Sequence, residues 1–375
     1  MKPFDEPIYV TRPLLPDLKE FTTELEDVWE SKWLTNNGPK HQQLEKEIRQ
    51  LLKVPNVSLF NNCTIALIVA INSLRVLGEV ITTPFTFPAT PHILAWNGIT
   101  PIFCDIDDRT MNIDADKIEQ MITPKTTAIL AVHVFGTPCD VDKIQEIADR
   151  YGLKVIYDAA HAFNTTINNI GIGTYGDISA FSFHATKLFH TAEGGALAFK
   201  DPNLKPRIDL LKNFGIKNED EVMMPGINGK MNEIQAALGL VNLRCMDAER
   251  QKRKKIVETY NKCLGTIKGI TVAQNPSGLQ DSYQYYVVRV NREQYGLSRD
   301  ELYVRLKDYN VFTRKYFYPL CSDYACYKHL PSAAPGHLPV ARKVVNEVLC
   351  LPLYGALPVD SAEKICELFK SMRKS

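Results

Sequence analysis

The sequence predicts an α/β fold: a three-layer α/β/α sandwich on a largely parallel sheet, followed by a smaller C-terminal α+β domain. Between about residues 40 and 200, helix-like and strand-like segments alternate, which is typical of a parallel sheet covered by helices. Several of the strand-like segments are apolar without alternation, so both of their faces are expected to be buried.

The expected elements follow one another along the first 200 residues. Residues 41–52 carry the apolar stripe of a helix that packs on one side. Residues 62–77 are apolar on most faces, as in a buried helix. Two further helices are expected at 115–122 and 141–151. Strands are expected at residues 79–83, 101–105, 127–134, 154–157, 178–183 and 195–199.

The pattern changes after about residue 245. Residues 246–263 indicate one long polar-faced helix that links two lobes, and residues 284–290 alternate as in a half-buried strand. Helices are expected at 299–309 and 361–372. A chain of 375 residues is long for one core, so we expect a large domain over residues 1–245 and a small one over 246–375.

Composition excludes several classes of protein. The net charge of +1 gives no reason to expect a nucleic acid or an anionic membrane as a partner. The nine cysteines are irregularly spaced and form no Cys-x-x-Cys pair, which argues against disulfides and a metal site and for a reducing compartment. No signal peptide or membrane-length apolar run is evident, so a cytoplasmic protein is expected.

Two ionisable residues stand at the ends of apolar runs. Asp158 ends the run from residue 154, and Lys187 follows the run 178–183. In parallel sheets, ligands bind at the carboxyl ends of strands. A lysine that forms a Schiff base and an aspartate that keeps a pyridine nitrogen protonated are what pyridoxal phosphate (PLP) chemistry needs. Taken singly, they could be a surface lysine and a helix N-cap.

Five sequence blocks resemble the DegT/DnrJ/EryC1/StrS family of sugar aminotransferases, in the family's order and spacing over nearly the whole chain. The blocks are residues 78–90, 158–161, 182–187, 193–196 and 228–236. The resemblance implies the aspartate aminotransferase fold (PLP fold type I), PLP as cofactor, and transfer of an amino group from L-glutamate to a nucleotide-linked keto sugar. Lys187 and Asp158 are then the catalytic residues.

The resemblance also implies the residues that hold the cofactor. Cys63 and Thr64 occupy the phosphate turn, with Cys63 in place of the usual glycine, at a helix N-terminus suited to a dianion. An ordinary N-capped helix would use the same residues. The Ser182 hydroxyl is expected to bind the phosphate, Phe87 to stack on the cofactor ring, and His161 to lie near the ring oxygen. Phe87 and His161 could instead be core residues.

The resemblance at Asn228 implies that the protein forms a homodimer. In the family this asparagine reaches across a homodimer interface to the neighbour's phosphate, so shared active sites are expected. In this chain Gly229 and Lys230 replace the family's common aromatic residue and arginine. The alternative for Asn228 is an ordinary turn with asparagine before glycine.

Two segments resemble the family's substrate contacts. Thr35 and Asn36 lie in a polar turn, which would place the first 40 residues near the substrate. Residues 313–320 combine aromatic and cationic side chains, which suit a nucleobase and a diphosphate; an exposed strand with ordinary surface charges is the alternative. The candidates there are Arg314, Lys315, Tyr316 and Tyr318.

The second segment resembles family members that aminate C4 of dTDP-4-keto-6-deoxyglucose, which implies a role in surface polysaccharide (O-antigen) synthesis. A 3-keto or UDP-linked sugar stays open as the substrate. Family members that act as dehydratases carry histidine in place of Lys187, so that reaction is disfavoured. A non-catalytic sugar-binding protein is disfavoured by the intact Lys187, Asp158 and Ser182.

Overall fold

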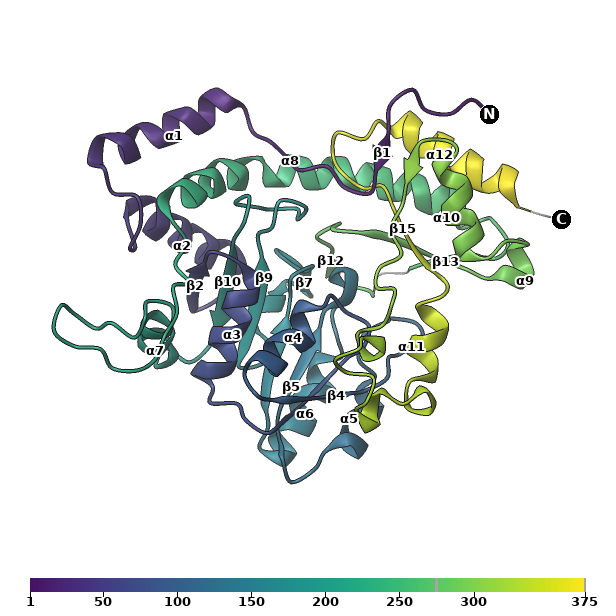
Figure 1. Ribbon diagram of the computed structural model, residues 1–375. Helices are drawn as coiled ribbons and strands as arrows, with labels where there is room; N and C mark the ends of the chain where they lie inside the picture. Colours follow the sequence, from purple (N-terminus) through teal and green to yellow (C-terminus); the bar gives the residue numbers. More distant parts are fainter. Residues whose placement is uncertain (274–275, 374–375) are drawn as a thin grey trace.

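The centre of the molecule is a seven-stranded sheet, seen in the computed structural model of residues 1–273 and 276–373 (Figure 1). The strand order is β2-β10-β9-β6-β5-β3-β4. The other six strands of this sheet run in one direction, and β10 runs in the opposite direction. The strands are β2 (Asn56–Phe60), β3 (Glu79–Thr82), β4 (Thr100–Phe103), β5 (Thr126–Val132), β6 (Lys154–Asp158), β9 (Ile178–Ser182) and β10 (Gly195–Phe199).

Helices cover both faces of this sheet, which makes the predicted three layers. One face packs against α2 (Pro39–Leu52), α5 (Ala115–Ile118), α6 (Val141–Tyr151) and the first part of α8 (Glu233–Leu264). The other face packs against α3 (Cys63–Ser73), α4 (Ala89–Trp96) and α7 (Leu204–Leu211). The sequence of β5 is apolar throughout because both of its faces are buried. Ile129 packs in the core under α2, α6 and α8, and Leu130 packs in the core under α3, α4 and α7. The α/β sandwich prediction is confirmed.

Local sequence signals set many element ends. The Asp140 side chain caps α6 by accepting the Lys143 amide at 3.1 Å, and Gly152 ends that helix at a φ of 67°. Helix α3 stops at Ser73, earlier than expected, because Arg75 adopts a φ of 56°. Four strands of the central sheet, β3, β6, β9 and β10, begin and end within one residue of the predicted limits.

The long helix was placed too short by the sequence pattern. Helix α8 begins at Glu233, not at residue 246. Asn232 and Gln235 start it with a reciprocal capping box, in which each side chain accepts the other residue's amide. Figure 1 shows α8 running from beside α2 in the N-terminal half to beside α12 in the C-terminal half.

A second group of elements surrounds the C-terminal half of α8. A three-stranded sheet contains β11 (Ile270–Val272), β13 (Tyr286–Val290) and β15 (Val348–Leu351). The helices in this part are α9 (Arg292–Tyr295), α10 (Arg299–Lys307) and α12 (Val359–Met372), whereas α11 (Pro339–Val344) packs in a separate apolar cluster with Phe85 and Phe103. Ile256, Val288 and Phe369 represent the apolar core of this second group.

The remaining elements join the two halves. Strand β1 (Ile8–Tyr9) pairs in parallel with β14 (Val311–Phe312). Strands β7 (Thr166–Ile167), β8 (Ile170–Gly171) and β12 (Leu279–Gln280) form a small sheet. Helix α1 (Leu18–Ser31) contacts the first part of α8. Residue 245 lies inside α8, and Phe4 and Ile8 pack on the C-terminal core, so the division at 245 stays a prediction.

Among the described residues, no helix has both the length and the apolar character that crossing a membrane requires.

Candidate active site

A cavity of about 250 Å³ opens at the carboxyl ends of the central strands, the place where ligands bind in such sheets. Loops that follow β2, β3, β6 and β9 supply most of its wall, and the segment before β13 closes one side. Its lining includes Cys63, Thr64, Phe87, Asp158, His161, Ser182, Lys187, Tyr285, Tyr316 and Phe317. Eight of the residues predicted from the sequence therefore share one cavity: Cys63, Thr64, Phe87, Asp158, His161, Ser182, Lys187 and Tyr316.

Lys187 projects into this cavity from the loop after β9. Its Nζ atom lies 3.5 Å from the Tyr285 hydroxyl and 5.6 Å from the centre of that ring. Burial lowers the pKa of the Lys187 amine to about 8, although Asp158 and Cys63 act in the opposite direction. A larger fraction of this amine is therefore neutral near pH 7 than for an ordinary lysine, which favours its use as a nucleophile or a base.

Asp158 ends β6 and is held in place by two hydrogen bonds. The Thr90 hydroxyl donates to Oδ2 at 2.8 Å, and the Ala160 amide donates to Oδ1 at 3.1 Å. Burial raises the pKa of this carboxyl group, while Thr90, Ala160 and Lys187 act to lower it. The carboxylate is thus fixed in orientation and faces a cavity that contains a cation.

His161 lies in the aromatic wall of the cavity. Its ring stacks on Phe317, with centroids 5.7 Å apart and planes 5° apart, and meets the edge of Tyr285 at 5.0 Å. Its buried Nδ1 atom has no hydrogen-bond partner. Burial holds the pKa of the imidazole well below its usual value, with a further contribution from Lys187. The ring is therefore neutral and has one polar atom without a partner.

The N-terminus of α3 forms another part of the wall. Asn62 caps the helix by accepting the Ile65 amide at 2.8 Å, which leaves the amides of Cys63 and Thr64 among those without an intrahelical partner. Cys63 does not adopt a positive φ, so the cysteine causes no backbone strain. A Cβ atom on Gly195 would lie 2.7 Å from the Cys63 nitrogen, so glycine is required for β10 to pass this close.

These residues fit PLP. The cavity combines an amine of lowered pKa, a fixed carboxylate, a histidine nitrogen without a partner and the free amides of a helix N-terminus. PLP carries an aldehyde, a pyridine nitrogen, a phenolic oxygen and a phosphate dianion, and these four groups need protein partners of these four kinds.

The other predicted site residues lie outside this cavity. Thr35 and Asn36 are exposed in the turn before α2, and Asn36 lines a different cavity. Asn228 is exposed at the base of the hairpin 213–228. Within one chain, these three residues do not meet Lys187.

The aromatic and cationic segment is divided. Tyr316 lines the cavity, whereas Lys315 binds Asp300 at 3.0 Å and lies over the rings of Tyr303 and Tyr318. Tyr318 also stacks on Arg299, at 5.3 Å from the guanidinium carbon. The Arg314 backbone pairs with Cys350, and its side chain is exposed.

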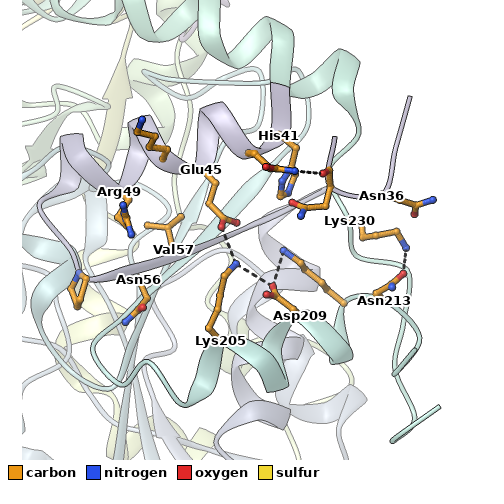
Figure 2. Close-up of a pocket in the computed structure, with 15 residues that line it drawn as sticks. Asn36, His41, Glu45, Arg49, Asn56, Val57, Lys205, Asp209, Asn213 and Lys230 are labelled. Atoms are coloured by element: carbon orange, nitrogen blue, oxygen red, sulfur yellow. Dashed lines mark hydrogen bonds and ion pairs between the residues drawn. The ribbon is translucent and has the colours of Figure 1, made fainter. Parts of the chain in front are cut away.

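A second cavity, of about 590 Å³, lies between α2 and α7 along the edge of β2 (Figure 2). Several of its charges neutralise one another. Lys205 binds Glu45 at 2.9 Å and Asp209 at 3.2 Å, and Lys212 also binds Asp209. Lys230 donates to the Asn213 side chain at 2.7 Å, as Figure 2 shows.

Tyr285 and Phe317, which contact Lys187 and His161, are among the lining residues of the first cavity that the sequence did not indicate. Phe317 lies between two residues that were named, and its neighbours gave the only signal. Tyr285 is 98 residues from Lys187 in the sequence, and nothing in its own segment pointed to this contact.

Fold and site together define a class: PLP-dependent enzymes of fold type I, with a lysine and an aspartate at the ends of neighbouring parallel strands. Residues 17–370 match the model of the DegT/DnrJ/EryC1/StrS aminotransferase family, and the chain belongs to that family. It is a PLP-dependent aminotransferase, as the resemblance implied.

Individual relatives agree with this assignment. The chain is 49% identical to the dTDP-4-amino-4,6-dideoxy-D-glucose transaminase of Escherichia coli, over 97% of this chain and 98% of the relative. The structure of DesI with its TDP-sugar product has a TM-score of 0.94 and 34% identity, covering 99% of this chain and 94% of the other. The PLP form of the putative sugar aminotransferase Spr1654 from Streptococcus pneumoniae has a TM-score of 0.90, 27% identity and 98% coverage of both chains.

Proposed function

We propose that this aminotransferase acts on a nucleotide-linked keto sugar and transfers the amino group of L-glutamate to dTDP-4-keto-6-deoxy-D-glucose, giving dTDP-4-amino-4,6-dideoxyglucose. The observation that carries the choice of sugar is the 49% identity, over nearly the full length of both chains, to a transaminase named for that product. The similarity to DesI, whose structure contains a TDP-sugar, supports the same class of substrate.

When bound, PLP supplies an electron sink and carries the amino group between the two half-reactions. We assign Lys187 two tasks: its amine holds the cofactor, and once free it moves a proton as a base and then as an acid. Its lowered pKa, about 8, suits this exchange near neutral pH. The negative charge of the Asp158 carboxylate would favour a protonated pyridine nitrogen, and Thr90 and Ala160 fix the orientation of that carboxylate.

The remaining cofactor contacts follow from the cavity wall. The amides of Cys63 and Thr64 and the hydroxyl of Ser182 are assigned to the phosphate, because they line the cavity at the N-terminus of α3. Phe87 is 56% exposed and lines the same cavity, so its ring is free to cover the cofactor. The unpartnered nitrogen of His161 is assigned to the ring oxygen.

We further propose a homodimer in which each subunit completes the other's site. The support is Asn228, which is exposed and is not among the residues that line the cavity of its own chain. The hairpin that carries it also exposes apolar side chains, among them Phe214, Val222 and Met223, a pattern that suits a partner subunit. Asn36 lines the second cavity together with Lys230, and we assign Asn36 and its neighbour Thr35 to the substrate held by the partner.

Within the segment 313–320, Tyr316 is the residue that we assign first to the substrate, because it lines the cavity. The roles of Arg314, Lys315 and Tyr318 stay predictions. We place the enzyme in the cytoplasm, where a reducing environment suits its nine free cysteines. Its product would serve surface polysaccharide synthesis, such as that of an O-antigen.

A substrate panel tests the choice of sugar. The enzyme is incubated with L-glutamate and, in parallel, with dTDP-4-keto-6-deoxyglucose, its 3-keto isomer and a UDP-linked 4-keto analogue. We expect the first sugar to have the highest kcat/KM and to give a 4-amino product by mass spectrometry and NMR. A preference for the 3-keto or UDP-linked sugar would contradict the proposed substrate and leave the aminotransferase class unaffected.

A further inference from the structure

Gln284, which lies just before β13, holds the backbone on both sides of Lys187. Its side chain is buried, with the residue only 2% exposed. The carboxamide oxygen accepts the Leu188 amide at 2.6 Å, and the carboxamide nitrogen donates to the Thr186 carbonyl at 2.9 Å. One carboxamide from the C-terminal half of the chain thus satisfies a donor and an acceptor that flank the lysine.

The next residue, Tyr285, contacts the other end of the lysine. The Lys187 amine lies 3.5 Å from the Tyr285 hydroxyl. The same ring meets His161 edge-on at 5.0 Å and Tyr316 edge-on at 5.7 Å. These contacts limit how the ring can turn, so its hydroxyl has a defined position beside the amine.

The same short segment also reaches the loop that follows β6. The Ser282 hydroxyl donates to the His161 carbonyl at 2.9 Å, across 121 residues of sequence. Residues 282–285 are therefore bonded to both loops that carry the cofactor-site residues. This arrangement couples the C-terminal half of the chain to the position of Lys187.

We propose that Gln284 and Tyr285, here called the lysine clamp, are positioning residues that return the free Lys187 amine to one place during turnover. A lysine side chain has four rotatable bonds, and a freed amine would otherwise explore many positions. The clamp fixes the backbone at one end and offers a hydroxyl at the other, which favours a productive geometry. The inference rests on the proposed role of Lys187.

The Gln284 half of the clamp is tested with Gln284→Leu, which removes both backbone contacts and keeps a similar volume. We expect kcat to fall by about tenfold to a hundredfold, since small misplacements at a reacting group have effects of this size. KM for the sugar should stay nearly unchanged. The Leu188 amide should exchange faster with deuterium in the cofactor-loaded protein, because it has lost its acceptor. Gln284→Glu, which keeps the acceptor, should restore protection of the Leu188 amide.

Gln280→Leu is the matched control, because the Gln280 side chain bonds to the Asn164 carbonyl at 3.4 Å, away from the lysine. It should leave kcat and the exchange of Leu188 unchanged. Wild-type kcat in Gln284→Leu, or a loss of thermal stability with kcat intact, would show that Gln284 is only structural.

The Tyr285 half is tested with Tyr285→Phe, which removes one oxygen atom. We expect a several-fold to tenfold fall in kcat with little change in KM, the size expected for one lost ordinary hydrogen bond, and a change in the visible absorbance of the cofactor-loaded protein. Tyr286→Phe is the control, because the Tyr286 hydroxyl donates to Asn261 at 2.9 Å, outside the cavity. Equal behaviour of the two variants would overturn the role of Tyr285.

Different experimental results would refute the clamp and the proposed role of Lys187. Attachment of the cofactor to another lysine would refute the role of Lys187, whereas unchanged exchange at Leu188 in Gln284→Leu would refute the clamp. If Gln284→Leu does not fold, Tyr285→Phe and Gln284→Glu still test the proposal. A fall in kcat without a matching rise in KM would support the clamp, and wild-type kcat in both variants would refute it.

Discussion

Tyr316 and Tyr318 stand two positions apart in the segment predicted to bind the substrate, yet their surroundings differ. Tyr316 is partly buried and lines the cavity beside Tyr285. Tyr318 is 51% exposed and stacks with Arg299 and Lys315. The sequence analysis assigned the two tyrosines the same predicted role because they are the same residue type. In the structure Tyr316 lines the cavity and Tyr318 does not.

This difference predicts unequal effects of the two alanine variants. Tyr316→Ala should lower kcat/KM for the nucleotide sugar by a factor that corresponds to about 1–3 kcal/mol, the range known for an aromatic residue that stacks on a base. Tyr318→Ala should change it by less than about 0.5 kcal/mol, because only surface contacts are lost. Steady-state kinetics with varied sugar concentration measure both. A larger loss in Tyr318→Ala would contradict this assignment.

At the scale of elements, strand β5 is followed directly by a buried histidine, His133, that makes the stability of the fold sensitive to acid. His133 is fully buried, its ring stacks on Tyr157 with centroids 4.6 Å apart, and its Nδ1 accepts the Cys139 amide at 3.1 Å. Its Nε2 atom has no partner. Burial lowers the pKa of His133 to about 3.

The sign of the pH effect follows from this shift. The unfolded chain binds a proton at His133 below about pH 6.5, and the folded chain does so only near pH 3. Stability is therefore lost as the pH falls through this window, by at most about 1.4 kcal/mol per pH unit for one such group. His133→Gln should make the slope of the unfolding free energy against pH smaller by up to this amount, measured by urea unfolding between pH 6.5 and 4. An unchanged slope would show that His133 does not carry the effect.

The elements also show what the sequence could predict. Strands such as β5 and β6 were found because burial on both faces requires uninterrupted apolar runs. The start of α8 was missed because its capping box, Asn232 to Gln235, lies within a block that had been interpreted only as a cofactor motif. Strand β2 was not predicted, because Ser58 interrupts its short apolar run.

The sequence placed Lys187 and Asp158 near each other because residue type and strand position coincide there, and both line the same cavity. Lys187 and Asp158 follow adjacent parallel strands, so topology alone brings them to one edge. Tyr285 and Gln284 were not predicted because Tyr285 lies 98 residues from Lys187 in the sequence and Gln284 lies 96 residues from Leu188, which it contacts. Such contacts depend on how the C-terminal half packs, which local periodicity does not encode.

At the scale of the whole molecule, the proposed dimer predicts complementation between two defective subunits. Lys187→Ala lacks the amine of its own site, and Asn228→Ala lacks the group offered to its partner. A mixed dimer would contain one site with both defects and one intact site. Equal mixing after reversible dissociation should therefore restore about a quarter of the wild-type activity, for random pairing in a two-fold dimer.

Two controls accompany the mixing experiment. Each variant incubated alone should stay nearly inactive, and the double variant Lys187→Ala/Asn228→Ala mixed with either single variant should restore nothing. Activity that never exceeds the sum of the two separate variants would contradict a shared site.

The central claim is that Lys187, in the cavity it shares with Asp158 and the N-terminus of α3, is the residue that carries the cofactor. The most direct measurement is borohydride reduction of the PLP-loaded protein, followed by proteolysis and mass spectrometry of the labelled peptide. We predict a single pyridoxyl label on Lys187, with none on the Lys187→Ala variant. A label on any other lysine, or an equal label on Lys187→Ala, would contradict the account.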